Sequence, residues 1–160
     1  MLTMRKIKNS SRIFGDQEKE WLIDILDAYA ETPVGNWLNS IPYSTGVEYY
    51  WCDAMTTESG ILGARPLFGN DIYVASNPTG ATHPEMVKHW IESIAPTAIH
   101  ELRHLYQQKI YGKLLWSILR LPEILPCFYG KLLIEKDALA IEEQADDVIL
   151  AEKHLSLFAD

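Results

Sequence analysis

The stretch Ala-Ile-His-Glu-Leu-Arg-His-Leu-Tyr-Gln-Gln-Lys-Ile-Tyr-Gly, residues 98–112, decides the fold that we expect. Apolar residues recur in it at helical spacing, beginning with Ile99 and Leu102. Pro96 suits the first turn of a helix, and Gly112 suits the cap at a C-terminal end. The sequence therefore predicts a helix from about residue 96 to residue 112, with an apolar stripe that faces a core.

Two histidines four residues apart lie at the centre of this predicted helix. On a helix His100 and His104 stand one above the other, so both can bind one metal ion. Glu101 lies on the neighbouring face, where its carboxylate can reach a water on that metal. The H-E-x-x-H pattern is the arrangement of zinc peptidases. We therefore expect His100 and His104 as metal ligands and Glu101 as the catalytic general base.

A catalytic zinc takes three protein ligands, so this pattern needs one more. A histidine six residues after His104 would be typical of metzincins, but that position is Ile110. The other three histidines, His83, His89 and His154, have no distinctive spacing to the motif. We expect His83 and His89 to be ordinary surface residues or histidines with satisfied hydrogen bonds. A downstream carboxylate is therefore the expected third ligand.

The composition is that of one ordinary globular domain spanning residues 1–160, with 48% apolar and 22% charged residues. The formal net charge of −8 argues against nucleic-acid binding, which needs a surplus of basic residues. The apolar segment 113–133 is interrupted by Pro122 and Pro126, so we expect no membrane span.

The two cysteines and the N-terminal sequence indicate the cellular compartment that we expect. Cys52 and Cys127 lie far apart without a C-x-x-C spacing, so we expect buried free thiols, which fits a reducing compartment. No secretory signal is visible at the N-terminus, and the expected location is cytoplasmic.

The segments before the motif predict an α+β domain with a small antiparallel sheet. Asp16 resembles an N-cap ahead of an amphipathic pattern that stops before Pro33, and Pro84 suits the start of another helix. Aromatic and β-branched runs predict strands, two of them joined as a hairpin. The expected elements are a possible short strand in 1–14, a helix at 17–31, strands at 47–52, 61–67 and 72–75, and a helix at 84–95.

A last helix is predicted over residues 131–155. Ile134, Ala138 and later apolar residues alternate at four and three positions and form a packing seam. Beside this seam runs a stripe that carries three carboxylates, namely Glu135, Glu142 and Asp146. If the two helices pack through their seams, the carboxylate stripe approaches the histidines.

At this point the chain resembles a known group of proteins. His-Glu-Leu-Arg-His-Leu-Tyr-Gln at 100–107, followed by Glu-Lys-Asp-Ala at 135–138, is similar to small zincin-like domains of the gluzincin branch of zinc metallopeptidases. The resemblance covers about residues 96–150. It implies a minimal zincin-like fold, in which the small sheet packs on the motif helix and on the helix that carries Glu135, and it implies Glu135 as the third zinc ligand.

Other carboxylates stay open as alternatives. Glu142 shares the stripe with Glu135, and Glu123 follows His104 at a gap that resembles that of aminopeptidase-type gluzincins. Asp146 is a candidate for orienting a ligating histidine by a hydrogen bond to its second ring nitrogen. The remaining acidic residues of the last helix are expected on a solvated face: Asp137, Glu143 and Asp147.

The expected activity is hydrolysis of peptide bonds by a zinc-activated water, with a peptide or protein as substrate. An oxyanion donor is also needed, and the tyrosines close to the motif in sequence are Tyr106, Tyr111 and Tyr129. An edge strand beside the metal could hold an extended peptide by main-chain pairing. The alternative is a catalytically silent protein of the same fold that binds a partner through its cleft.

Overall fold

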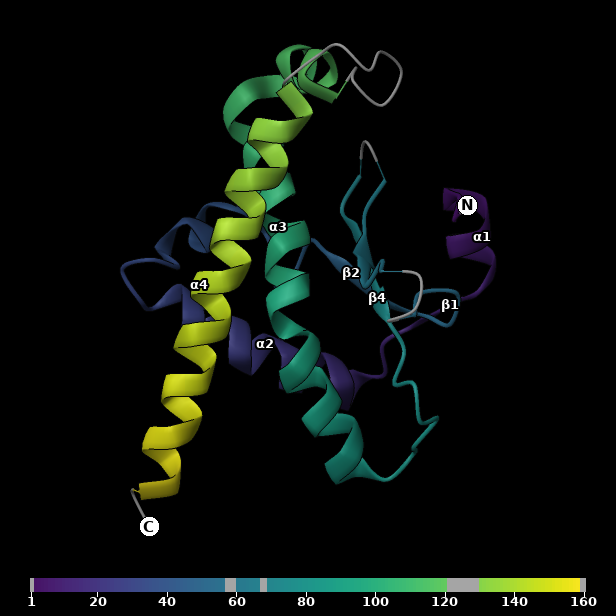
Figure 1. Ribbon diagram of the computed structural model, residues 1–160, viewed down its shortest axis with the longest axis vertical. Coiled ribbons are helices and arrows are strands. Elements are labelled where there is room, and N and C mark those ends of the chain that lie inside the picture. Colours follow the sequence, from purple (N-terminus) through teal and green to yellow (C-terminus); the bar gives the residue numbers. More distant parts are fainter. Residues whose placement is uncertain (1, 57–59, 67–68, 121–129, 159–160) are drawn as a thin grey trace.

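The computed structural model describes residues 2–56, 60–66, 69–120 and 130–158. Over these residues the chain is an α+β domain in which four α-helices and a short 3₁₀ helix surround a four-stranded sheet (Figure 1). The α+β class expected from the sequence is confirmed. The elements are α1 (Met4–Asn9), β1 (Ser11–Ile13), α2 (Asp16–Ala30), η1 (Asn36–Ser40), β2 (Glu48–Cys52), β3 (Gly63–Ala64), β4 (Asp71–Ala75), α3 (Pro84–Arg120) and α4 (Gly130–Phe158).

The sheet is mixed, and the expectation of an antiparallel sheet was wrong. Its order is β1-β2-β4-β3; β1 pairs with β2 and β3 with β4 in the antiparallel sense, but β2 and β4 run parallel. The chain leaves β2, returns through β3 at the edge, and then inserts β4 between them. Four successive residues of β4 are buried, which is typical of a parallel strand covered on both faces and not of an alternating antiparallel one.

The predicted hairpin is present but shorter than expected. Gly63 faces Val74 and Ala64 faces Tyr73 across the β3–β4 pair. Because β4 lies between β2 and β3, this hairpin places β3 at the edge of the sheet, next to α3.

Helix α2 begins one residue earlier than predicted, and its cap differs. Gly15, not Asp16, is the N-cap residue. The Glu18 carboxylate accepts a hydrogen bond of 2.8 Å from the Gly15 backbone N–H, one of the N–H groups at the start of the helix that have no partner within the helix. The Glu18 carboxylate also accepts a hydrogen bond of 2.9 Å from the Trp51 indole N–H, and this bond connects α2 to the sheet. The short α1, capped by Thr3, was not predicted.

Helix α3 is the central element, since it contacts the sheet on one side and α4 on the other (Figure 1). The two helices predicted at 84–95 and 96–112 form one run, because Pro96 is accommodated inside it. The predicted stop at Gly112 is a sharp break, where φ is 73° and ψ is 162°. A positive φ of this size costs glycine little and other residues more.

Helix α4 runs back antiparallel to α3 (Figure 1). Its predicted seam is confirmed, since Ile134, Ala138 and Ala145 are buried. The small side chains of Ala138 and Ala145 let α4 come close to α3. No helix of the described residues is long and apolar enough to cross a membrane. Cys52 is a buried free thiol, as expected, and Cys127 lies outside the described residues.

Gly63 sets the distance between β3 and α3, which leads to the first prediction. A Cβ at Gly63 would lie 2.6 Å from Cγ2 of Thr97 and 3.1 Å from Oε1 of Glu101. Overpacking of this kind costs about 1–3 kcal/mol. We expect Gly63→Ala to lower the free energy of unfolding in urea by that amount.

The matched second change is Thr97→Ser, which removes Cγ2 and keeps the hydroxyl. The double variant Gly63→Ala/Thr97→Ser should recover at least half of the loss, because the closest contact is gone. A double variant that is no more stable than Gly63→Ala would contradict this account of the close approach.

Candidate metal centre

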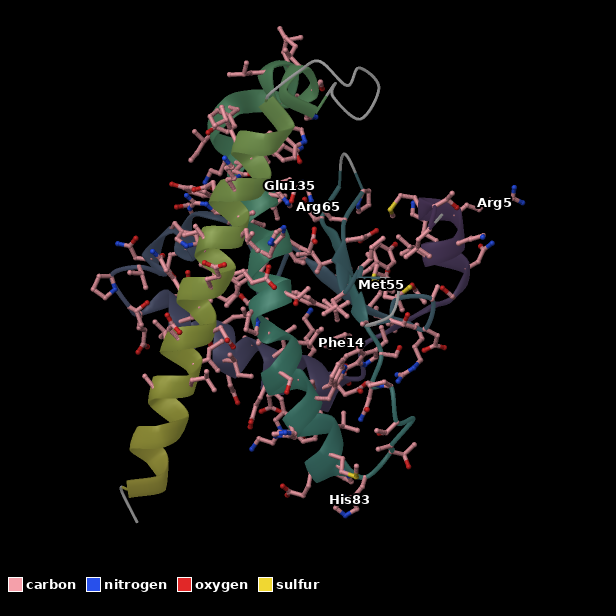
Figure 2. The ribbon with its side chains drawn as sticks, in the orientation of Figure 1. Arg5, Phe14, Met55, Arg65, His83 and Glu135 are labelled. Carbon is pink, nitrogen blue, oxygen red and sulfur yellow. The ribbon has the colours of Figure 1, made fainter. Side chains whose placement is uncertain are left out.

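Three side chains from two helices converge on one point. Nε2 of His100 and Nε2 of His104 are 3.2 Å apart, and the Glu135 carboxylate lies 3.3 Å from the first and 3.4 Å from the second. The ligand atoms of all three residues lie within 4.8 Å of one another. Figure 2 shows Glu135 on α4 at the level where α4 crosses α3.

These separations fit a tetrahedral metal site. Bonds of about 2.0–2.1 Å at tetrahedral angles place two ligand atoms about 3.3 Å apart. The three measured separations, 3.2, 3.3 and 3.4 Å, surround that value. Two imidazole nitrogens and one carboxylate oxygen are also the donor set of a catalytic zinc site. The same ligands accept other first-row divalent ions, so the donor set alone does not identify the metal.

Helix α3 provides the two histidines because residues 100 and 104 are one turn apart on its cleft-facing side. His104 is 3% exposed, and Leu102 beside them is fully buried. Glu135 comes from the first turns of α4, where the antiparallel pairing brings the start of α4 alongside the histidines. The third ligand implied by the resemblance is therefore the carboxylate that lies at the two Nε2 atoms.

Glu142 does a different task from Glu135. Its Oε2 lies 2.7 Å from Nδ1 of His100, on the opposite side of the ring from Nε2. The Thr97 hydroxyl donates a hydrogen bond of 3.3 Å to its other oxygen. A carboxylate at Nδ1 holds a proton there, which makes Nε2 the nitrogen that can bind a metal after it loses its own proton. Glu142 is thus placed to orient a ligand.

Gln107 does the corresponding task for His104. Its amide NH₂ donates to the Ile134 carbonyl at 3.1 Å and to the Asp137 carboxylate at 2.8 Å, so its Oε1 is the atom that faces Nδ1 of His104 at 2.9 Å. An amide oxygen accepts only, so Nδ1 of His104 carries the proton. Sequence reasoning had not assigned Gln107 a role, although it stands three residues after His104 in the quoted motif.

Asp137, expected on a solvated face, is partly exposed, at 41% of its side chain, but it also has partners on α3 that were not expected. Arg103 donates two hydrogen bonds to its carboxylate, at 2.7 and 3.1 Å, and Gln107 adds a third. These bonds, those of Arg103 first, lower the pKa of Asp137. The Arg103 guanidinium also lies over the rings of Trp37 and Tyr106, at 5.0 and 4.7 Å from their centroids. The bonds between Arg103 and Asp137 join α3 to α4 two residues beyond Glu135.

The other candidates lie elsewhere. Asp146, a candidate for orienting a histidine, is exposed, and Glu142 and Gln107 occupy both Nδ1 positions. Glu123 and Tyr129 lie outside the described residues. His89 lies 3.9 Å from Glu92, far along α3 from the motif, as expected of an ordinary surface histidine.

A cavity of about 490 Å³ opens beside the three ligands. It is lined on one side by the β3 hairpin from Gly60 to Arg65, and on the other by the two histidines and the three carboxylates Glu101, Glu135 and Glu142. Tyr106 packs against Trp37, and Tyr111 is exposed; among the described residues, neither lines the cavity.

Glu101 lies in the wall of this cavity and is 8% exposed. Burial raises its pKa, while the nearby His104, His100 and Arg65 oppose that shift. A carboxyl group with a raised pKa takes up a proton more readily than an exposed one. Arg65 is itself buried; it donates to the Gly69 carbonyl at 2.9 Å and to the Gln108 amide oxygen at 2.7 Å.

The protonation of His100 is tied to its two carboxylate neighbours. Burial alone would lower its pKa, but hydrogen bonds with Glu135 and Glu142 raise it to about 10. Burial would raise the pKa of Glu135, and its hydrogen bonds with the two histidines lower it instead. In the metal-free protein at neutral pH, His100 is therefore a cation between two carboxylates.

Comparison with known proteins adds no assignment. The chain matches no model of a protein family, and neither a curated protein nor a solved structure matches it significantly. The resemblance to gluzincins therefore rests on the two short motifs, and the site rests on its own geometry.

Metal binding is expected to release a proton. A ligating imidazole must be neutral at the nitrogen that binds, and the raised pKa keeps His100 protonated at pH 7.5. Calorimetric titration with zinc in buffers of different ionisation enthalpy should therefore show about one proton released per ion. The apparent affinity should fall as the pH is lowered. A binding enthalpy that is the same in all buffers would contradict this assignment of the His100 proton.

The Gln107 contact leads to a separate prediction on metal affinity. Removing a group that orients a ligating histidine typically weakens metal binding by about 10–100-fold. We expect this loss in Gln107→Ala, measured by competition with a chromophoric chelator. Gln144→Ala, an exposed glutamine on the same pair of helices, is the control and should bind as the wild type does. Equal affinities in the two variants would remove Gln107 from this role.

Proposed function

We propose that this protein is a zinc-dependent peptidase, with zinc held by His100, His104 and Glu135. The observation that carries the proposal is the meeting of four groups in one cavity: three ligand atoms at tetrahedral spacing and a buried carboxyl group beside them. The fourth group is Glu101, which follows the first ligand directly in sequence.

The groups of the chain suit a hydrolytic reaction. Zinc at this position would lower the pKa of a bound water to about 7 and polarise the carbonyl of a substrate. Glu101 would take the proton from such a water and pass it to the leaving amine, as a general base and then a general acid. Its raised pKa supports both transfers, since a strongly acidic carboxylate would accept the proton poorly.

The edge strand supports a peptide as substrate. Strand β3 is the last strand of the sheet, and residues 60–64 line the cavity that holds the ligands. An extended peptide can add to such an edge by main-chain hydrogen bonds, which hold the scissile bond without demanding a particular side chain. Gly63 leaves the backbone close to Glu101, so a peptide paired with β3 would lie across the general base.

The second candidate, a silent protein that binds a partner through its cleft, would be favoured by a blocked cavity. The described residues leave the cavity of about 490 Å³ open beside the ligands, and they supply the buried Glu101 that a binding protein does not need. Both observations favour the peptidase.

The variant Glu101→Gln tests the proposal, because it keeps the shape of the side chain and removes the base. We expect zinc to stay bound at one ion per chain and hydrolysis to fall by about 10²–10⁴-fold, the usual contribution of a general base. The readout is mass spectrometry of a mixed peptide library incubated with each zinc-loaded protein.

Glu143→Gln is the matched control, since Glu143 is an exposed carboxylate on α4. It should cleave the library as the wild type does. Cleavage at the wild-type rate by Glu101→Gln would remove this residue from the mechanism. A wild type that binds zinc but cleaves no member of the library would favour the silent alternative.

A further inference from the structure

A patch of apolar side chains lies exposed where α3 ends and α4 begins, at the top of the molecule in Figure 1. Of the twelve large exposed apolar residues of the described chain, six fall here, which makes a patch and not a scatter. Leu114 is the most exposed of them, at 78%. We call these six the apical patch: Ile110, Tyr111, Leu114, Leu115, Ile118 and Leu133.

The break at Gly112 and the burial of Trp116 together produce this patch. Gly112 interrupts the helix, so the last turns of α3 continue in a new direction across the end of the domain (Figure 1). Trp116 is fully buried and anchors these turns; its ring lies 6.1 Å from that of His104, and the Arg65 guanidinium lies over it. With Trp116 turned inward, Leu114 and Ile118 point outward.

Exposed basic side chains accompany the apical patch. Lys109 and Lys113 are both exposed there. The described residues 104–120 and 130–134 contain no acidic residue. The exposed charge at this end therefore differs in sign from the net charge of the whole chain, which is −8.

We infer that the apical patch docks on the surface of an anionic lipid bilayer. Apolar side chains beside lysines suit the boundary between acyl chains and negative headgroups. The acidic remainder of the chain is repelled by the same headgroups, which orients the molecule with this end towards the membrane. A second copy of the chain would fit poorly, because its own Lys109 and Lys113 would face those of the first. No described helix can span a membrane, so the docking is interfacial.

The inference bears on the substrate of the proposed peptidase, and in this part it rests on that proposal. Trp116 joins the apical patch to His104, so the cavity lies directly beneath the docked end. Peptide segments close to the membrane surface are therefore the substrate class that this placement favours. The docking itself requires no metal.

The experiment is flotation of the full chain with lipid vesicles, of phosphatidylcholine alone or mixed with phosphatidylglycerol. We expect the wild type to float with the mixed vesicles and to be released by high salt. Leu114→Ser should bind at least tenfold more weakly, as loss of one buried leucine predicts. Lys113→Gln should bind about fivefold more weakly, as loss of one charge near the surface predicts.

Matched controls lie at the other end of α3. Met86 is 50% exposed and Lys88 is exposed, so Met86→Ser and Lys88→Gln make the same kinds of change away from the patch. Both should bind as the wild type does. All four positions are exposed, so the variants should unfold at the wild-type temperature.

Three results would overturn the inference: no flotation of the wild type with mixed vesicles, equal losses in the patch and control variants, or a vesicle-free dimer that Leu114→Ser dissolves. His104→Ala separates this test from the proposed function. If that variant loses zinc but still floats, the docking stands whether or not the protein is a peptidase. If zinc binds and the vesicles do not, the peptidase proposal stands without the membrane.

Discussion

The antiparallel contact between α3 and α4 is the constraint on which the site depends. Helix α3 carries both histidines of the candidate metal site, and among the described residues the carboxylate that would complete a three-ligand set, Glu135, comes from α4. The relative position of the two helices is fixed by small buried residues, Ala138 and Ala145, and by the paired bonds between Arg103 and Asp137. A shift of α4 by one turn, about 5.4 Å, would take Glu135 away from both rings.

The polar network between the helices joins structure to chemistry. Gln107 donates to the Ile134 carbonyl and to Asp137 on α4 while its oxygen fixes the tautomer of His104. The same bonds that hold α4 in place therefore prepare a ligand. Glu142 does the equivalent for His100. Each imidazole ring thus has one side-chain partner at Nδ1, and both Nε2 atoms face Glu135.

This arrangement concentrates charge in a partly buried space. Three carboxylates and two imidazoles line one cavity, and the raised pKa of His100 shows how strongly the carboxylates favour a positive charge among them. A divalent cation at the same place would satisfy the same carboxylates and displace the His100 proton. The apical patch gives the C-terminal end of α3 an apolar surface with exposed lysines. Helix α3 therefore carries both the two histidines and most of the apical patch.

Much of the fold and the centre of the site could be predicted from the sequence. The helical spacing of His100 and His104 is a local property, and so are the hairpin and the seam of α4. The choice between Glu135 and Glu142 is not local, because both lie on one face of α4 two turns apart. Only the register of α4 against α3 decides which carboxylate meets Nε2 and which meets Nδ1.

The parallel pairing of β2 with β4 was missed for a related reason. Strand order depends on where the β3 hairpin returns, and no short-range pattern records that. The role of Asp137 was missed because a carboxylate beside a seam looks solvated until the position of Arg103 on the neighbouring helix is known. In each case the information lies between elements and not within one.

The measurement that tests the central claim most directly is anomalous diffraction at the zinc edge from crystals of the zinc-loaded protein. The account predicts one peak, about 2.0–2.2 Å from Nε2 of His100, Nε2 of His104 and a carboxylate oxygen of Glu135. A peak bound by Glu142 in place of Glu135, or no ordered metal at the two histidines, would contradict it.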